Sequence, residues 1–256
     1  MNSLERSLVE KSGYDSGFEY IESSTAHEVV LASARHPAKA SITKAGSQFE
    51  VKLSSLKSPL LSKEVRRSFP DLVESATGFY VDSEMELAKL LRRAASLSYS
   101  LPNQAANNYH SLLEKELEAL APGTRGTEIE RLVRQRIGQQ SYRSAMMDYW
   151  GGACAVTGIS IPEVLRASHA KPWAECLSDE ERLNVFNGFL LSANLDALFD
   201  RFLISFENSG KLITSPKISL EQREALGLHK SLSLRWIAEE HLEYLEHHRK
   251  EFSNRY

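Results

Sequence analysis

The chain has 256 residues, enough for two modest domains, of which 42% are apolar, 9% aromatic and 25% charged. This ordinary globular composition excludes a chain that is mainly disordered, collagen-like or a coiled-coil fibre. The formal net charge of −3 also excludes a polycation that binds nucleic acid through its overall charge.

Three features of the sequence concern its compartment. No apolar run approaches the roughly 18 residues of a membrane-spanning helix, so no membrane partner is expected. The first ten residues mix both charges and lack the apolar core of a secretory signal. The only cysteines, Cys154 and Cys176, are too few for a disulfide framework. We therefore expect a cytoplasmic protein.

The first part of the chain alternates between strand and helix patterns. Residues 18–56 mix β-branched and aromatic residues, which predicts strands, and Ala45-Gly46-Ser47 has the composition of a hairpin turn. From Ser83 the apolar spacing becomes helical, and Glu86 three residues later completes the pattern of a capping box. A second helix is predicted over residues 104–120. Residues 1–120 are therefore predicted to form a small α+β domain.

The segment APGTRGT at residues 121–127 is the predicted linker, because Gly, Pro and Thr dominate it. Thr127 is predicted to cap a long amphipathic helix that leads into a second domain, residues 125–256. Three roles stay open for the first domain: target recognition, dimerisation, which implies a homodimer, or contact with a partner protein. Its candidate DNA contacts are residues 35–39, Lys44, Arg66, Arg67, Arg92 and Arg93.

Basic residues cluster around the start of the second domain. Residues 125–171 contain seven basic and four acidic side chains, a local net charge of +3. Arg131, Arg134 and Arg136 lie on the predicted long helix. Two interpretations are equally weighted there: contacts to DNA phosphates, or an ordinary solvated helix face.

Residues 149–216 contain the pattern that carries chemistry. A short strand, LRASHA, holds His169 and ends at Lys171-Pro172, and Asn187-Gly188 is a turn that leads into a second, apolar strand. Asn194 is a reasonable N-cap for the helix LDALFDRF, and a hairpin is predicted through residues 208–210. Asp196 and Asp200 are four residues apart on that helix and share one face. The order predicts a ββα unit.

Such a unit can hydrolyse a phosphodiester with one divalent metal ion, which requires hard oxygen ligands. Asp196 supplies a carboxylate of that kind, and the His169 imidazole can take a proton from the attacking water. The Asn187 amide cannot do acid–base chemistry but can hydrogen-bond across the turn. Charge dominates phosphate affinity. The basic residues nearest to these groups in the sequence are Arg166, Lys171 and Arg201.

The motifs SH-x-KPW and NG-x-LLS-x-NLDALFD resemble those of the HNH (ββα-metal) endonucleases, specifically a bacterial restriction-type group. The resemblance implies that the C-terminal domain is a nuclease that hydrolyses DNA in restriction or phage defence. It implies His169 as general base, Asn187 as the central asparagine, Asp196 as a metal ligand and Asp200 as a further one. Mg²⁺ is the expected cofactor, with Mn²⁺ or Ni²⁺ as substitutes.

Some residues depart from the family pattern. Ser168 stands where many members place a metal-binding Asp or His, so coordination is expected to rest on Asp196, Asp200, water and substrate. Thr157 stands where a second zinc-binding cysteine would be, so no structural zinc is expected. His247 and His248 are predicted to lie on a solvated helix surface.

Two alternatives to an autonomous nuclease stay open. The first is a non-catalytic ββα module that binds nucleic acid, which Ser168 favours. The second is a nuclease subunit that becomes active only with a partner or on modified DNA.

Overall fold

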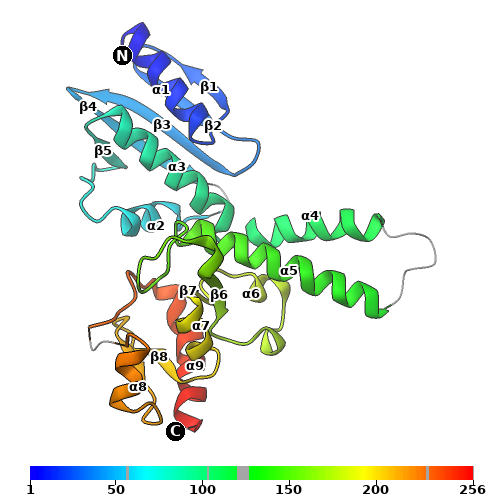
Figure 1. The fold of residues 1–256 in the computed structure, drawn as a ribbon. Helices are drawn as coiled ribbons and strands as arrows, with labels where there is room; N and C mark the ends of the chain where they lie inside the picture. Colours follow the sequence, from blue (N-terminus) through cyan, green and yellow to red (C-terminus); the bar gives the residue numbers. More distant parts are fainter. Residues whose placement is uncertain (56–57, 103, 120–126, 229–230, 256) are drawn as a thin grey trace. The chain divides into compact units, whose positions relative to one another are not determined.

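The computed structural model describes every residue except 56–57, 103, 120–126, 229–230 and 256. It confirms the predicted α+β class and divides the chain into two compact units, Met1–Gln104 and Ala105–Tyr256 (Figure 1). The predicted linker lies outside the described residues, apart from Thr127, where a helix begins.

The first unit contains a five-stranded antiparallel sheet whose strands are neighbours in chain order. Its predicted hairpin is confirmed, since Ala45 pairs with Gln48 across a two-residue turn. Gly46 has φ 64° in that turn, a conformation that favours glycine. The strands are β1 (Tyr20–Ser24), β2 (Glu28–Ala32), β3 (Ala38–Ala45), β4 (Gln48–Ser55) and β5 (Phe79–Val81).

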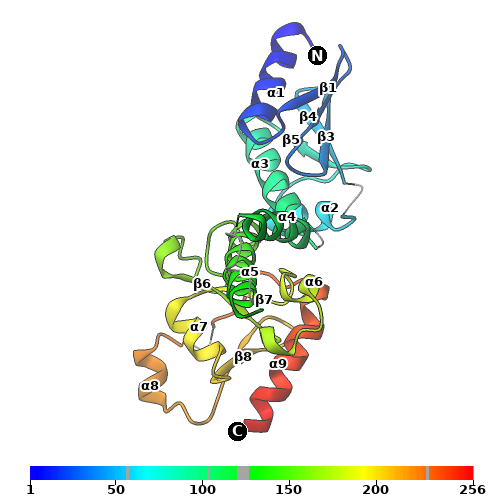
Figure 2. The ribbon, with the colours of Figure 1, turned by 90° about the vertical axis from the view of Figure 1, so that its right-hand side faces the viewer.

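Three helices complete this unit: α1 (Ser3–Asp15), α2 (Leu61–Ser68) and α3 (Glu84–Ser100). Helices α1 and α3 pack against each other and against the sheet (Figures 1 and 2). The predicted cap of α3 is confirmed, because the Ser83 side chain accepts a hydrogen bond from the backbone N–H of Glu86. The reciprocal bond of a capping box is not formed, because the Glu86 carboxylate accepts from the backbone N–H of Asp82, at 2.8 Å, instead of that of Ser83.

Several candidate DNA contacts of the first unit are ion-paired with its own acids. Lys39 Nζ lies 2.6 Å from Glu22 Oε1, and Lys44 Nζ lies 3.3 Å from Glu5 Oε1. Arg66 pairs with Glu74, and Arg67 pairs with the buried Glu64. These pairs reduce the charge that the unit offers to a phosphate backbone.

The second unit starts earlier than residue 125, the start predicted for the second domain. Helix α4 (Gln104–Glu118) falls within it almost entirely, followed by α5 (Thr127–Tyr149). The physical reason is contact between the two helices. Arg136 on α5 pairs with Glu116 on α4 at 2.7 Å, and the Arg134 charge on α5 acts on the buried Tyr109 of α4.

The predicted ββα unit is present. Strand β6 (Leu165–His169) pairs antiparallel with β7 (Gly188–Ser192), which runs directly into α7 (Ala193–Phe199). The predicted N-cap was wrong. Because β7 continues to Ser192 and the helix begins at once, Ser192 is the N-cap and Asn194 lies in the first turn. Helices α5 and α7 both pack against β6 (Figures 1 and 2).

The rest of the second unit surrounds the ββα unit. Short helix α6 (Asp179–Arg182) lies in the loop between β6 and β7. The predicted hairpin is confirmed as β8 (Ile204–Phe206) and β9 (Leu212–Thr214), followed by α8 (Leu220–Ala225) and α9 (Leu242–Arg255). Single 3₁₀ turns lie at Pro162–Val164, Trp173–Glu175 and Glu239–His241.

The core of the second unit includes a histidine that was expected on the surface. His248 is 1% exposed, and its ring stacks on Phe199 with ring centres 3.8 Å apart. Its Nε2 donates to the Phe199 carbonyl at 3.0 Å, and its Nδ1 accepts from the Ser205 hydroxyl at 2.9 Å. The prediction failed because these partners are distant in sequence. His247 pairs with Glu175.

Among the helices that the structure describes, none has the length and apolar character needed to cross a membrane.

Candidate active site

Strand pairing brings His169 and Asn187 together. His169 is the last residue of β6 and lies opposite Gly188, the first residue of β7. The ladder continues one step further, because the backbone N–H of Ala170 donates to the Asn187 carbonyl at 3.1 Å. Two motif residues that are 18 positions apart therefore occupy adjacent ends of two paired strands.

The protonation pattern of His169 follows from one hydrogen bond. Its Nε2 lies 2.8 Å from the carbonyl oxygen of Arg182, which can only accept, so Nε2 carries the proton. In the neutral ring Nδ1 is then the unprotonated nitrogen. Burial lowers the pKa of His169 to about 4, so the ring is neutral at pH 7. The neutral His169 ring can therefore accept a proton at Nδ1.

Two aromatic rings fix the plane of the imidazole. Tyr142 of α5 stacks on His169 with ring centres 3.8 Å apart and planes 20° apart. Trp173 approaches the same ring edge-on, with centres 5.7 Å apart. The stacked and the perpendicular ring together restrict rotation of the imidazole about its second side-chain torsion.

Asn187 holds the loop that follows His169. Its side chain is fully buried, and its Oδ1 accepts from the backbone N–H of Lys171 at 2.8 Å. Its Nδ2 donates to the carbonyls of Lys171 and Glu181 and to Cys176 Sγ, each at 3.3 Å. One amide thus ties the start and end of the 171–181 loop to β7, close to the carbonyl of Arg182 that holds His169.

Asp196 lies in the first turn of α7, half-buried, and its Oδ1 accepts a hydrogen bond from the Ser168 hydroxyl. It shares a cavity of about 540 Å³ with the catalytic candidate His169. The cavity is lined from α5, β6, the loop after β6 and α7, by Gln135, Gln139, Tyr142, Arg143, Arg166, Ala167, His169, Trp173, Ala174 and Asp196.

Asp200 lies one turn beyond Asp196 and outside this cavity. It is exposed at the C-terminus of α7. Partial desolvation and the nearby Asp196 charge raise the pKa of Asp200, while Arg201 acts in the opposite direction. The two carboxylates therefore repel each other electrostatically.

The site fits an ion that keeps much of its own water. Within the described ranges, no group of three His, Cys, Asp or Glu side chains is arranged to hold a metal ion. Mg²⁺ usually binds through one or two carboxylates, several waters and substrate phosphates. Asp196, half-exposed in a cavity and with only its Oδ1 engaged by Ser168, fits such a site.

The predicted phosphate contacts near the motif have different surroundings. Arg166 is exposed and lines the cavity, and its Nη1 donates to the carbonyls of Glu163 and Leu165. Lys171 does not line this cavity, because its Nζ lies 2.6 Å from Glu181 Oε1. Arg201 is exposed beside Asp200.

The three candidate contacts on α5 are exposed. Arg131 pairs with Glu128 on the same helix, Arg136 pairs with Glu116 on α4, and the Arg134 charge acts on Tyr109 of α4. Of Arg134, Arg136, Arg166, Lys171 and Arg201, the structure therefore brings only Arg166 into the cavity that holds His169 and Asp196.

Four cavity residues on α5 were not identified from the sequence: Gln135, Gln139, Tyr142 and Arg143. Arg143 donates to the carbonyls of Leu165 and Pro162 at 2.6 and 2.7 Å, so it braces the start of β6. Tyr142 is spaced from Met146 and Tyr149 as on the buried face of a helix, so its sequence signal is that of a core residue.

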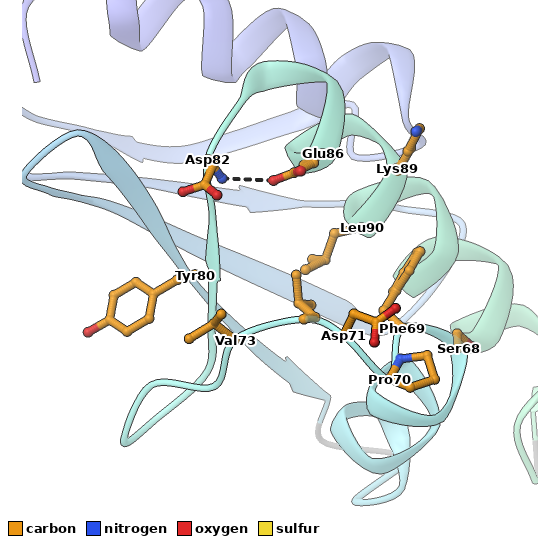
Figure 3. Close-up of a pocket in the computed structure, with 11 residues that line it drawn as sticks. Ser68, Phe69, Pro70, Asp71, Val73, Tyr80, Asp82, Glu86, Lys89 and Leu90 are labelled. Carbon is orange, nitrogen blue, oxygen red and sulfur yellow. Dashed lines mark hydrogen bonds between the residues drawn. The ribbon is translucent and has the colours of Figure 1, made fainter.

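The first unit has a separate cavity of about 390 Å³ beside α3 (Figure 3). Figure 3 shows the carboxylates of Asp71, Asp82 and Glu86 around the apolar side chains of Phe69 and Leu90. The lining carries three carboxylates against one ammonium, that of Lys89, so the net negative charge repels phosphate. This cavity is therefore unsuited to the backbone of a nucleic acid.

Comparison with known proteins agrees with this geometry. Residues 154–207 match the sequence model of a family described as HNH endonuclease. The C-terminal half of the chain therefore carries a domain of the HNH endonuclease family, which confirms the resemblance seen in the motifs. The match includes His169, Asn187 and Asp196 but not α5. A search of curated proteins found no match to the chain.

Membership of this family has general consequences. An HNH endonuclease domain indicates a function related to nucleic acid and implies DNA as a partner, and HNH nucleases generally use a divalent metal ion.

Proposed function

We propose that this protein is a metal-dependent endonuclease that hydrolyses DNA phosphodiester bonds, with His169 as its general base. The observation that carries the proposal is the hydrogen bond from His169 Nε2 to the Arg182 carbonyl, which leaves Nδ1 as the proton acceptor. The same cavity contains the Asp196 carboxylate. A base and a hard oxygen ligand in one cavity are the two groups that such hydrolysis takes from the protein.

His169 acts on the attacking water. Nδ1 accepts a proton as the water oxygen bonds to phosphorus and the bond to the leaving 3′ oxygen breaks. The imidazolium that forms keeps its Nε2–H directed at the Arg182 carbonyl, whose partial negative charge stabilises it. Asn187 acts indirectly by holding the loop that supplies this carbonyl, and Arg166 contacts a phosphate at the cavity rim.

Asp196 would hold the metal ion, with Asp200 as a second carboxylate one helical turn away. When bound, the ion neutralises developing negative charge on the scissile phosphate and the leaving oxygen. Ser168 contributes by orienting the Asp196 carboxylate through its hydroxyl rather than by coordination. Mg²⁺ is the proposed physiological ion, with Mn²⁺ or Ni²⁺ as substitutes.

Calorimetry with Mn²⁺ tests these ligands. Asp196→Asn should abolish measurable binding, whereas Asp200→Asn should weaken it by roughly tenfold because its carboxylate lies outside the cavity. Glu207→Gln, an exposed carboxylate beyond β8, is the matched control. Unchanged Mn²⁺ binding by Asp196→Asn would contradict the assignment.

Plasmid cleavage tests the activity. With Mg²⁺ or Mn²⁺ the wild-type protein should nick supercoiled DNA, and His169→Ala should be slower by roughly 10²- to 10⁴-fold, the usual contribution of a general base. Equal nicking by both proteins would contradict the proposal.

The resemblance to restriction-type members supports a role in restriction or phage defence. A cleavage panel over unmodified, methylated and phage DNA examines this role. Cleavage confined to one class would identify the modification read, and cleavage only after addition of a cell extract would favour a subunit that needs a partner.

One observation favours a non-catalytic nucleic-acid-binding module as a second candidate. The Ser168 hydroxyl donates a hydrogen bond to one carboxylate oxygen of Asp196. Ser168 itself stands where many family members place a metal ligand. This candidate predicts DNA binding without cleavage, and no more Mn²⁺ binding than an Asp196→Ala variant.

A further inference from the structure

We infer that Tyr142 of α5 is a positioning residue that fixes both His169 and Asn187, so that the site extends beyond the matched segment 154–207. The inference rests on the proposed function, because it names a further residue of the same site. Tyr142 touches no reacting atom in this account and acts through the two residues that it holds.

The first contact of Tyr142 is with the base. Its ring stacks on the His169 imidazole with centres 3.8 Å apart, the closest aromatic contact of that imidazole. The hydrogen bond from Nε2 to the Arg182 carbonyl fixes one point of the ring. A single hydrogen bond does not fix the plane, and stacking supplies this second constraint.

The second contact is with the turn between the loop and β7. The Tyr142 hydroxyl is buried and donates to the Asn187 carbonyl at 2.9 Å, the same carbonyl that accepts from the Ala170 N–H. Burial raises the pKa of Tyr142 well above 10, so the phenol keeps its proton and remains a donor. One side chain therefore links the residue that carries the base to the residue that orders its loop.

Two glycines provide the space that this arrangement requires. A Cβ on Gly188 would lie 2.4 Å from the Tyr142 hydroxyl oxygen and 1.9 Å from the Ser168 carbonyl oxygen. A Cβ on Gly138, one turn before Tyr142 on α5, would lie 2.5 Å from the Trp173 ring. Only glycine fits at both positions, which shows that α5 and the ββα unit approach each other closely at this site.

The consequence for chemistry concerns the geometry of Nδ1. A ring that rotates about its second side-chain torsion moves Nδ1 and loses the Arg182 bond, after which either nitrogen can carry the proton. The fraction of molecules with Nδ1 unprotonated and directed into the cavity then falls. Binding of DNA, which depends on phosphate contacts elsewhere, is unaffected.

Two substitutions separate the two contacts. Tyr142→Phe keeps the stacked ring and removes the hydroxyl donor, whereas Tyr142→Leu removes the ring as well. Tyr149→Phe is the matched control, because Tyr149 is a fully buried tyrosine on the same helix that packs on Trp150 and Phe186 instead.

The first measurement uses the metal-free protein and needs no activity. Imidazole ¹⁵N NMR should show His169 protonated on Nε2 in wild type, Tyr142→Phe and Tyr149→Phe. In Tyr142→Leu it should show averaged tautomers. A wild-type tautomer retained in Tyr142→Leu would overturn the inference.

The second measurement is steady-state cleavage. For Tyr142→Phe, kcat should fall about tenfold, as expected when one buried hydrogen bond is lost. For Tyr142→Leu it should fall about a hundredfold, as expected for a misplaced reacting group. KM for DNA should stay within about twofold in both variants, since uniform binding is retained.

The outcomes distinguish this inference from the proposed function. A wild-type protein that cuts no DNA would contradict the proposed function, while the NMR result would still decide whether Tyr142 fixes the His169 ring. A rise in KM with unchanged kcat in either variant would place Tyr142 in DNA binding and overturn its positioning role. If Tyr142→Leu fails to fold, Tyr142→Phe still decides through its kcat.

Discussion

His169 depends on a backbone carbonyl for the role proposed for it as general base. The Arg182 oxygen accepts from Nε2 and so assigns the lone pair to Nδ1, without any second ionisable side chain. The adjacent side chains, Tyr142 and Trp173, are aromatic rather than acidic. Burial is therefore the main influence on the charge state of this base, and it favours the neutral ring.

The pH dependence of cleavage follows from this burial. Since the pKa of His169 is lowered to about 4, the base stays neutral as the pH falls from 7 through the ordinary histidine value of 6.5. The value of kcat/KM should decline only as the pH approaches about 4, when Nδ1 takes up a proton. Cleavage measured from pH 4 to 8 at saturating Mn²⁺ checks this. A fall in kcat/KM centred near pH 6.5 would show that the His169 ring is solvated instead.

At the scale of elements, the close pairing of β6 with β7 requires a glycine at position 188. Gly188 has φ 154°, and a Cβ there would collide with the Ser168 carbonyl that belongs to the paired strand. The turn dipeptide Asn187-Gly188 therefore combines a buried amide with a position that only glycine fits. Neither residue can change without moving the strand that carries His169.

Gly188→Ala should lower the free energy of unfolding by about 3 kcal/mol or more, because backbone atoms of a packed strand must shift. Gly158→Ala is the matched control. Gly158 has φ 71° but nothing within 4 Å of its Cβ, so only the left-handed strain of about 1–2 kcal/mol applies. Urea unfolding of both variants provides the comparison, and equal losses would contradict the proposed close approach.

Helix α9 contributes a titrating group to the core through His248. Burial lowers the pKa of His248 to about 4, so the unfolded chain binds a proton that the folded one does not between about pH 6.5 and 4. Stability should be fully present above pH 6.5 and fall as the pH drops through this window, by up to about 3 kcal/mol from this residue.

The measurement is urea unfolding at several pH values for wild type and His248→Gln, which retains a donor and an acceptor. The variant should lose less stability between pH 6.5 and 4 than wild type, with the remaining slope due in part to His169. Identical slopes would show that His248 is not held neutral by the fold.

Local sequence patterns predicted local structure well. The hairpin at Gly46, the Ser83 cap and the strands around His169 follow from turn chemistry, capping and alternation, which act over a few residues. The Asn194 cap was wrong because the length of β7 is set by its pairing with β6. His248 was wrong because its partners Phe199 and Ser205 lie more than forty residues away in the sequence.

The candidate site shows the same division. The motifs identified His169, Asn187 and Asp196, and the register of two strands explains how the first two become neighbours. The Arg182 carbonyl carries no side-chain signal, and Tyr142 has the pattern of a core residue. Lys171, predicted to contact a phosphate, pairs with Glu181, a partner that the motif itself does not indicate.

For the whole molecule, net charge is a poor guide to where DNA binds. The chain carries −3, and the basic cluster of residues 125–171 is partly neutralised by acids of the same unit. Arg136 pairs with Glu116, and Lys171 pairs with Glu181, whereas Arg166 lies exposed at the cavity. Of these three basic residues, Arg166 is the one without an acidic partner in the described part of the chain, and it lines the cavity of His169 and Asp196.

Chemical rescue is the most direct test of the central claim, that the His169 imidazole is the base. His169→Gly removes the ring and leaves space for added imidazole beside Tyr142. Cleavage of supercoiled plasmid by this variant should be restored in proportion to the imidazole concentration, while Asp196→Ala should gain nothing. Cleavage by His169→Gly at the wild-type rate without imidazole, or no restoration in a variant that still folds and binds DNA, would contradict the account.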